Sequence, residues 1–390
     1  MLSLSDIVNV KVGIGRGVFE APGATVIGGN TPTFDQQILK LFSNGEQGFF
    51  YDPNDLSTMY QDAGGTVPVT AAGQAVGLIL DKSKGLALGS NLIPNGSFSS
   101  DTAWGKGAGW TIADGVARFD GSAAFSNLGN TTPSSINGKW LRVELDLSNV
   151  GTLVTQVRIL VSGALAATIP VSGAGKYSAR VLGGSVPSIG IQSQGQSGAN
   201  YAFTLDNVSV KEAFGSHAYQ STSASRPILR QNATTGANYL EFDGADDFLQ
   251  TAVSLPFPVT AVAPFDFKSN TLMKCILSAG AAGYLRSTET MASVHSVAGG
   301  GSIAKKKVDV LLHELTGDSV NIRSNSDAIM MSVIENNPYI ASNKYIGSFS
   351  DTHTTLRAAM DLYGMVVIRK VLSTSEEAEL RAHFNKRMGI

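Results

Sequence analysis

The residue combinations that usually carry catalysis are missing from this sequence. It has no nucleophile elbow, no zinc-binding His-Glu-x-x-His pair and no phosphate-binding glycine loop. The single cysteine, Cys275, excludes an intramolecular disulfide framework and a cysteine-based zinc cage. The histidines are scattered without the spacing of metal ligands: His217, His295, His313, His353 and His383. We therefore expect a protein that is not an enzyme.

Two groups of carboxylates deserve a test against this expectation. Glu144 and Asp146 share one face of an expected strand at 141–147, and paired carboxylates on a sheet are the catalytic groups of glycoside hydrolases. The alternation of that strand instead places both on its solvent face. A second acidic group brackets a glycine, but its spacing fits no EF-hand, which favours a polar turn over a calcium loop: Asp243, Asp246 and Asp247.

The elements that would position these residues are mostly strands. The chain has 43 glycines and only 15% charged residues, which suits many short strands joined by tight turns. Period-2 alternation is clear at 141–147 and 155–161. The fold class expected is all-β: two β-sandwiches of the jelly-roll type, with a short N-terminal arm and helix and a C-terminal helix at 373–387.

The N-terminal region needs a surface on which to pack. A helix is expected from Thr33 as N-cap to Gly45 as stop, with four apolar residues on one face: Phe34, Ile38, Leu41 and Phe42. The preceding arm alternates like a short strand, with apolar residues at Ile7, Val8 and Val10. These residues are candidate contacts with another subunit or with an assembly to which the chain attaches.

Length and charge limit the number of domains and the kinds of partner that we expect. A chain of 390 residues predicts two domains with an appendage. The net charge of −2 and pI of about 6.2 give no reason to expect nucleic acid, and the run Lys305–Lys307 is expected to be a solvated turn. With no long apolar run and no secretion signal, we expect a protein made in the cytoplasm without a membrane partner.

Three segments resemble virion-associated proteins of tailed bacteriophages. The first is the phrase Tyr51-Asp-Pro-Asn-Asp-Leu through Asp81-Lys-Ser83. The second, Asn91 to Glu212, is similar to the family 4/9-like carbohydrate-binding modules, which open with a phrase like Asn95-Gly-Ser-Phe98 and close with one like Asp206-Asn-Val-Ser-Val210. The third begins at Gly215-Ser-His-Ala-Tyr-Gln220 and resembles a concanavalin-like (laminin-G type) lectin fold.

The resemblance implies an inserted domain. In similar proteins the phrase ending in Asp81-Lys-Ser often runs directly into one like Gly215-Ser-His. The expected domains are therefore 1–48 as anchor or oligomerisation segment, 49–85 plus 215–390 as one discontinuous lectin-like sandwich, and 86–214 as an inserted carbohydrate-binding-module-like jelly roll.

Candidate binding residues follow within the inserted module. Trp104 and Trp110 lie in its loop-rich start, where exposed indoles would serve as platforms for sugar rings, although core packing is the favoured alternative, above all for Trp110. The resemblance also implies a structural calcium near the first strand, with Asn95 and Asp206 as the two ligands that can be named. No other cofactor is expected.

The function implied is that of a phage surface fibre or spike, displayed on the virion, that contacts host glycans. Its partners would be other virion proteins and sister chains, with a homotrimer expected by analogy with such fibres. The alternatives are a capsid or tail decoration protein that makes only protein–protein contacts and, last, a glycan hydrolase.

Overall fold

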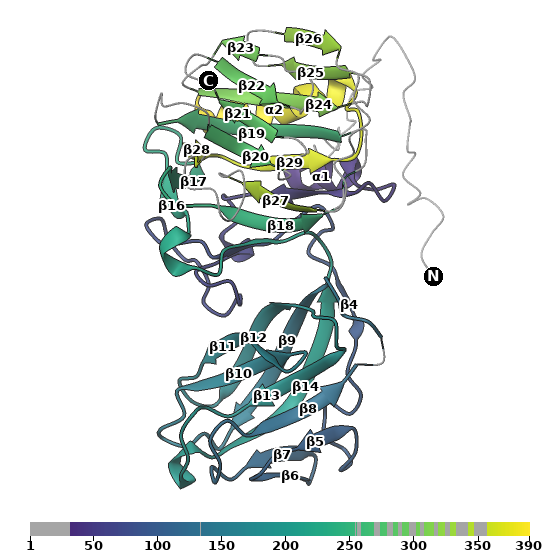
Figure 1. Cartoon of the computed structure of the whole chain (residues 1–390), viewed down its shortest axis with the longest axis vertical. Helices are drawn as coiled ribbons and strands as arrows, with labels where there is room; N and C mark the ends of the chain where they lie inside the picture. Colours follow the sequence, from purple (N-terminus) through teal and green to yellow (C-terminus); the bar gives the residue numbers. More distant parts are fainter. Residues whose placement is uncertain are drawn as a thin grey trace, which may run out of the picture. The chain divides into compact units, whose positions relative to one another are not determined.

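The protein is built from two β-sandwiches, as the sequence predicts, with a helix near each end of the described chain (Figure 1). The computed structural model describes residues 32–132, 134–253, 255, 259–268, 274–278, 284–287, 291–295, 302–304, 308–315, 319–323, 328–332, 342–346 and 357–390. Ile7, Val8, Val10 and Lys305–Lys307, which the sequence singles out, lie outside these residues. Within them, no helix is long and apolar enough to cross a membrane.

The first sandwich is formed by residues 88–213 and has two antiparallel sheets. Its five-stranded sheet runs β11 (Ala164–Pro170), β10 (Gln156–Val161), β13 (Ser188–Gln192), β8 (Asn127–Thr131), β5 (Trp104–Lys106). Its six-stranded sheet runs β12 (Gly175–Leu182), β9 (Trp140–Ser148), β14 (Phe203–Ala213), β7 (Val116–Phe119), β6 (Trp110–Ala113), with β4 (Leu88–Asn91) paired to β14. Alternate apolar side chains of both sheets fill the space between them, as period 2 requires.

The second sandwich also has two sheets, of nine strands each over the described residues. One runs β16 (Ile228–Gln231), β17 (Asn238–Asp243), β28 (Ala359–Leu362), β19 (Val259–Phe267), β24 (Val308–Leu315), β25 (Ser319–Arg323), β26 (Ala328–Ser332), and includes β1 (Gly48–Tyr51) and β29 (Met365–Ile368). The other runs β2 (Met59–Tyr60), β3 (Leu78–Ile79), β15 (Ala218–Tyr219), β18 (Leu249–Val253), β27 (Ser342–Ile346), β20 (Lys274–Ser278), β21 (Tyr284–Ser287), β22 (Met291–His295), β23 (Ser302–Ala304).

The second sandwich is discontinuous in sequence. Its strands β1, β2 and β3 precede residues 88–213, whereas their partners β29 and β15 follow them. The buried carboxylate of Asp81 joins the two parts: Oδ1 accepts from the backbone N–H of Phe50 at 2.9 Å, and Oδ2 accepts from that of Ser216 at 2.8 Å. The Asp81 N–H in turn donates to Nδ1 of His217 at 3.0 Å. The chain thus leaves the second sandwich beside Asp81 and returns to it at Ser216.

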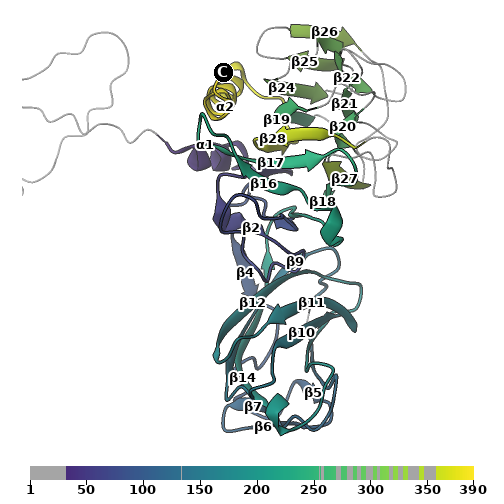
Figure 2. The same cartoon turned by 90° about the vertical axis from the view of Figure 1, so that its left-hand side faces the viewer.

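Both helices pack on the same sheet of the second sandwich. α1 (Phe34–Leu41) and α2 (Thr374–Met388) lie on one side of it in Figure 2, and their apolar residues share a core with Phe50, Val262, Val366 and Ile368. α2 begins with a capping box of Ser373 and Glu376 and ends at Gly389 in the left-handed conformation.

This packing corrects the expectation of a subunit contact at α1. Ile38, Leu41 and Phe42 are buried within the chain itself, and the Phe34 ring stacks on His383 of α2 with centroids 3.3 Å apart. Ion pairs also hold the two helices on the sheet. Lys82 Nζ lies 2.9 Å from Asp35 of α1, and Nη1 and Nη2 of Arg387 on α2 both donate to the Asp52 carboxylate. The apolar face that the sequence shows is covered by the protein's own sheet and C-terminal helix.

Candidate functional site

The outer face of the five-stranded sheet in the first sandwich is the candidate site. Val157, Ile159 and Ile191 point into the core, so the residues that alternate with them on β10 and β13 point outward. The register places Arg158 of β10, Gln192 of β13 and Asn127 of β8 in one row across three neighbouring strands. Polar side chains from separate strands are thereby brought side by side.

The row is held together by specific contacts. Arg158 Nη1 donates to Gln192 Oε1 at 2.6 Å, and the Arg158 guanidinium lies over the Phe125 ring at 4.7 Å from its centroid. Phe125 precedes β8 and is 52% exposed, more than half of a large aromatic side chain. Its ring also lies against the backbone of Gly195, where a Cβ would sit 2.4 Å from Phe125 Cζ. The aromatic ring is therefore fixed in place while remaining open to solvent.

A strip of glycines borders this row. Gly190, Gly129 and Gly105 are opposite one another on β13, β8 and β5. Above Gly105 the nearest atom to an added Cβ is the Gly129 carbonyl oxygen at 3.8 Å, so this end of the strip is open. At the other end the Asn127 side chain lies over Gly190, where an added Cβ would be 2.5 Å from Asn127 Oδ1, so the free space beside the polar row is at Gly105 and Gly129.

The polar row on this face offers hydrogen bonding. Arg158 carries five N–H donors, and the amides of Gln192 and Asn127 offer both donors and acceptors. None of the five strands contains Asp or Glu. A pair of carboxylates, which glycoside hydrolysis requires, is therefore missing from the strands of this sheet.

The tryptophans that the sequence puts forward as platforms are buried. Trp104 and Trp110 are 6% and 5% exposed and belong to the core of the first sandwich. Trp104 Nε1 donates to the Asn95 carbonyl at 2.9 Å, and the Trp110 ring packs on Phe119 and Phe203. Sugar stacking on these indoles is contradicted, because neither indole face is available to a ligand, and the core packing that the sequence favours is confirmed.

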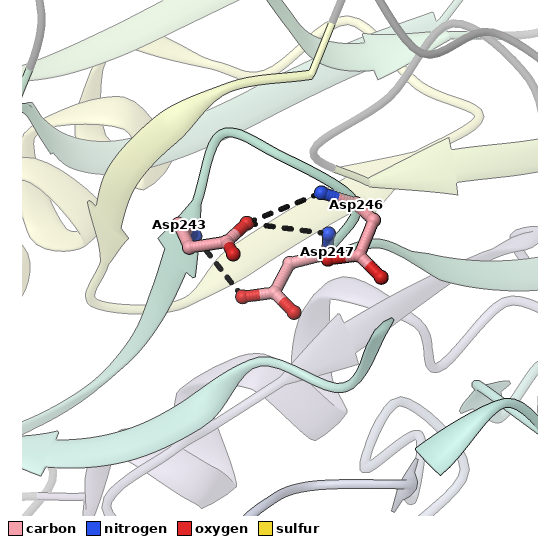
Figure 3. A group of neighbouring side chains, drawn as sticks. All are labelled: Asp243, Asp246 and Asp247. Carbon is pink, nitrogen blue, oxygen red and sulfur yellow. Dashed lines mark hydrogen bonds between the residues drawn. The ribbon is translucent and has the colours of Figure 1, made fainter. Parts of the chain in front are cut away.

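The acidic group of the second sandwich forms a compact loop between β17 and β18 (Figure 3). Asp243 Oδ1 accepts from the N–H groups of Ala245, Asp246 and Asp247, and Asp247 Oδ2 accepts from the Asp243 N–H at 3.0 Å. Burial raises the pKa of Asp247 to about 6, and the charges of Asp243 and Asp246 raise it as well.

These three carboxylates could hold a metal ion such as Ca²⁺, because one oxygen of each lies within 4.8 Å of the others. The side chains already serve the loop itself, as the polar turn predicted from the sequence requires. Ser225 Oγ also donates to Asp246 Oδ2 at 2.7 Å. A cation would be added to a loop that its own hydrogen bonds organise.

The other predicted calcium ligands bond to different groups. Asn95 has a positive φ of 52° and its amide donates to the carbonyls of Ser100 and Thr102, closing its own loop. Asp206 lies on β14 and accepts from the N–H and the amide of Asn207. The structure does not show Asn95 and Asp206 as a shared calcium site.

No protein-family model and no curated protein matches the chain. Among solved structures, it is similar to the CBM40 module of a Ruminococcus gnavus IT-sialidase bound to alpha2,3 sialyllactose, at 10% identity over 33% of this chain and 83% of that one, with a TM-score of 0.28. It is also similar to a family 29 carbohydrate-binding module, at 18% identity over 31% of this chain and 86% of that one, with a TM-score of 0.24.

A third similar structure belongs to botulinum neurotoxin type C, whose cell entry depends on two ganglioside molecules. The identity is 12%, the match covers 43% of this chain and 48% of that one, and the TM-score is 0.31. All three likenesses are to parts of this chain and all have low TM-scores.

Proposed function

We propose that the first sandwich binds a glycan on the outer face of its five-stranded sheet, and that the protein is a non-enzymatic adhesion component. The observation that carries the proposal is the row of Arg158, Gln192 and Asn127, with exposed Phe125 at its end and the glycine strip alongside. Sugar hydroxyls need a dense set of donors and acceptors, and their C–H faces pack on aromatic rings. This face offers both, with the polar row and the exposed part of the Phe125 ring next to each other.

Binding without hydrolysis fits the strands that carry the site. These strands contain no acidic residue, so none of them supplies the pair of carboxylates that glycoside hydrolysis uses. An open sheet face also suits weak single sites whose affinities combine when many copies are displayed together.

The place of display that we propose is a virion surface, as a fibre or spike. This part rests on the resemblance of the sequence segments to tailed-phage proteins, with residues 1–33 as the attachment segment, because α1 is already packed within the chain. Trimerisation through that segment would supply the avidity. Deleting residues 1–33 should abolish incorporation into particles; a truncated protein that still copurifies with virions would refute the attachment role.

The glycan site is tested by binding of the full-length chain, immobilised at high density, to a glycan array. Arg158→Gln should weaken binding at least about tenfold, since it removes both the bond to Gln192 and the contact over Phe125. Arg118→Gln is the matched control: Arg118 is a 44% exposed arginine on β7 of the other sheet, paired with Asp114. Equal binding by the two variants would refute the site, and no binding at all by the native chain would favour the decoration role.

A further inference from the structure

A small cavity of about 110 Å³ lies where the first sandwich meets the second. Its apolar lining comes mainly from the segment that connects the two, including Leu80, Leu88 and Phe214. Its polar lining is cationic or neutral: Arg142 and Arg180 from the six-stranded sheet, with His217 and Ser57 from the second sandwich. No carboxylate lines it among the described residues.

The two arginines are direct neighbours by register. Arg180 of β12 is opposite Arg142 of β9, which is opposite Lys211 of β14, so three cations form one row across the sheet. Cross-strand partners of like charge repel each other. One counter-charge is close, since Arg142 Nη2 lies 2.7 Å from Glu144 Oε1. That single carboxylate leaves an excess of positive charge at the cavity.

Arg180 is the most buried of the three cations. It is only 9% exposed, yet no carboxylate or carbonyl accepts from its guanidinium among the described residues. Its one close side-chain partner is the Tyr60 ring, 4.4 Å from Arg180 Cζ. Arg142 Nε is likewise buried with no hydrogen-bond partner in the described part of the chain. A guanidinium that is little exposed and lacks an acceptor is costly, so Arg180 on this wall, with the unpartnered Nε of Arg142 beside it, points to a ligand that supplies the acceptors.

His217 does not supply the missing negative charge. Its Nδ1 accepts from the Asp81 N–H, which places the single ring proton on Nε2. Burial and the nearby Arg180 lower the pKa of His217 to about 3, so the ring is neutral at physiological pH. The cavity wall therefore combines two cationic side chains and one neutral imidazole.

We infer that this cavity binds a small organic carboxylate, with the carboxylate on Arg180 and Arg142 and its carbon skeleton against Leu80, Leu88 and Phe214. The planar fork of an arginine matches two carboxylate oxygens. The size limits the ligand, because a dry cavity that binds benzene has a volume of about 150 Å³. A cavity of about 110 Å³ takes one carboxylate with a short apolar chain, or the carboxylate end of a larger molecule such as a uronic sugar.

The experiment measures binding of butyrate, glucuronate, butyramide and sodium chloride to the full chain by calorimetry and by the shift in melting temperature, at matched ionic strength. Butyrate should bind and raise the melting temperature, whereas butyramide and chloride should not. Glucuronate tests which kind of carboxylate the cavity takes. Tighter binding of glucuronate than of butyrate would indicate a sugar acid, and weaker binding a small aliphatic carboxylate. A melting-temperature rise that chloride reproduces would overturn the inference.

Arg180→Met provides the decisive variant, because it keeps the apolar stem and removes the charge. It should weaken butyrate binding at least about tenfold while leaving the unliganded melting temperature unchanged or higher. Arg142→Gln should weaken binding in the same direction if Arg180→Met fails to fold. Arg230→Met, which removes an arginine that is 46% exposed in the second sandwich, is the charge-matched control and should bind normally. Unchanged butyrate binding by both cavity variants would overturn the proposal.

Discussion

Acidification should destabilise the protein through His217, the buried histidine at the junction of the two sandwiches. The side chain is 2% exposed, its Nδ1 accepts from the Asp81 N–H at 3.0 Å, and its ring lies 5.4 Å from that of Trp140. Burial, with a smaller effect of the Arg180 charge, lowers its pKa to about 3 in the folded protein. Protonation would put a charge into this site and would remove the acceptor for Asp81.

The magnitude follows from proton linkage. An unfolded histidine has a pKa of about 6.5, so between pH 6.5 and pH 3 the unfolded chain binds more protons and stability falls as the pH falls. For folded and unfolded pKa values of about 3 and about 6.5, this histidine costs about 0.2 kcal/mol at pH 7 and about 2.7 kcal/mol at pH 4.5. The unfolding free energy should therefore drop by about 2.5 kcal/mol over this range because of His217 alone.

The assay compares urea unfolding of the native chain and of His217→Asn at several pH values, followed by tryptophan fluorescence. Asparagine keeps an acceptor near the position of Nδ1 but does not titrate, so the difference between the two chains cancels the other ionisable groups. That difference should shrink by about 2.5 kcal/mol from pH 7 to pH 4.5. Parallel stability curves for the two chains, or an NMR titration of His217 with a midpoint near 6.5, would refute the reasoning.

Three further predictions concern other parts of the fold. Phe384 is a fully buried residue of α2, and Phe384→Ala should lower the unfolding free energy measured in urea by about 3–5 kcal/mol. Leu39→Ala, on the exposed side of α1, should lower it by less than about 0.5 kcal/mol. Equal losses would contradict the packing. Gly48→Ala should lower the melting temperature sharply, because φ of Gly48 is 144° and a Cβ would lie 2.0 Å from the Val367 carbonyl oxygen. Gly115→Ala is the control: its Cβ would meet no atom within 4 Å, so only the strain of its positive φ should lower the melting temperature. At pH 7.5, millimolar Ca²⁺ should raise the melting temperature of the native chain but not of Asp247→Asn, and chelation should reverse the rise; the same response in both chains would rule out the Asp243–Asp247 loop as the calcium site.

The sequence was informative where local pattern and physical need agree. Alternation at 141–147 predicts the strand found at Trp140–Ser148, and the acidic start and basic end of 373–387 predict the helix found at Thr374–Met388. The resemblance assigns 49–85 to the second sandwich, and the apolar strands of this segment, too few to be stable alone, agree with that assignment. Their pairing with β15 and β29, and the bonds of Asp81 across the insertion, supply the missing neighbours.

The sequence was misleading where a residue type had two uses. An amphipathic helix face such as that of α1 shows that a partner surface is needed, but nothing local tells whether that surface lies in the same chain, here 340 residues away at α2, or in another. An indole is both a sugar platform and a large core residue, and Trp104 and Trp110 are used in the core. An aromatic that stays exposed beside the polar row is Phe125, a residue in a loop with no pattern of its own.

The candidate sites could not be predicted from the sequence, because the pairing of strands brings their residues together. Arg158, Gln192 and Asn127 are far apart along the chain and carry no motif, and only the pairing of β10, β13 and β8 puts them in one row. The same holds for Arg142, Arg180 and Lys211 on the opposite sheet. Alternation does show that each of these side chains faces away from the core, since Val143, Ala179 and Val210 beside them face inward. What alternation cannot show is that the second sandwich covers Arg180 while the outer face around Arg158 stays open, and on this difference in burial the two proposed sites differ.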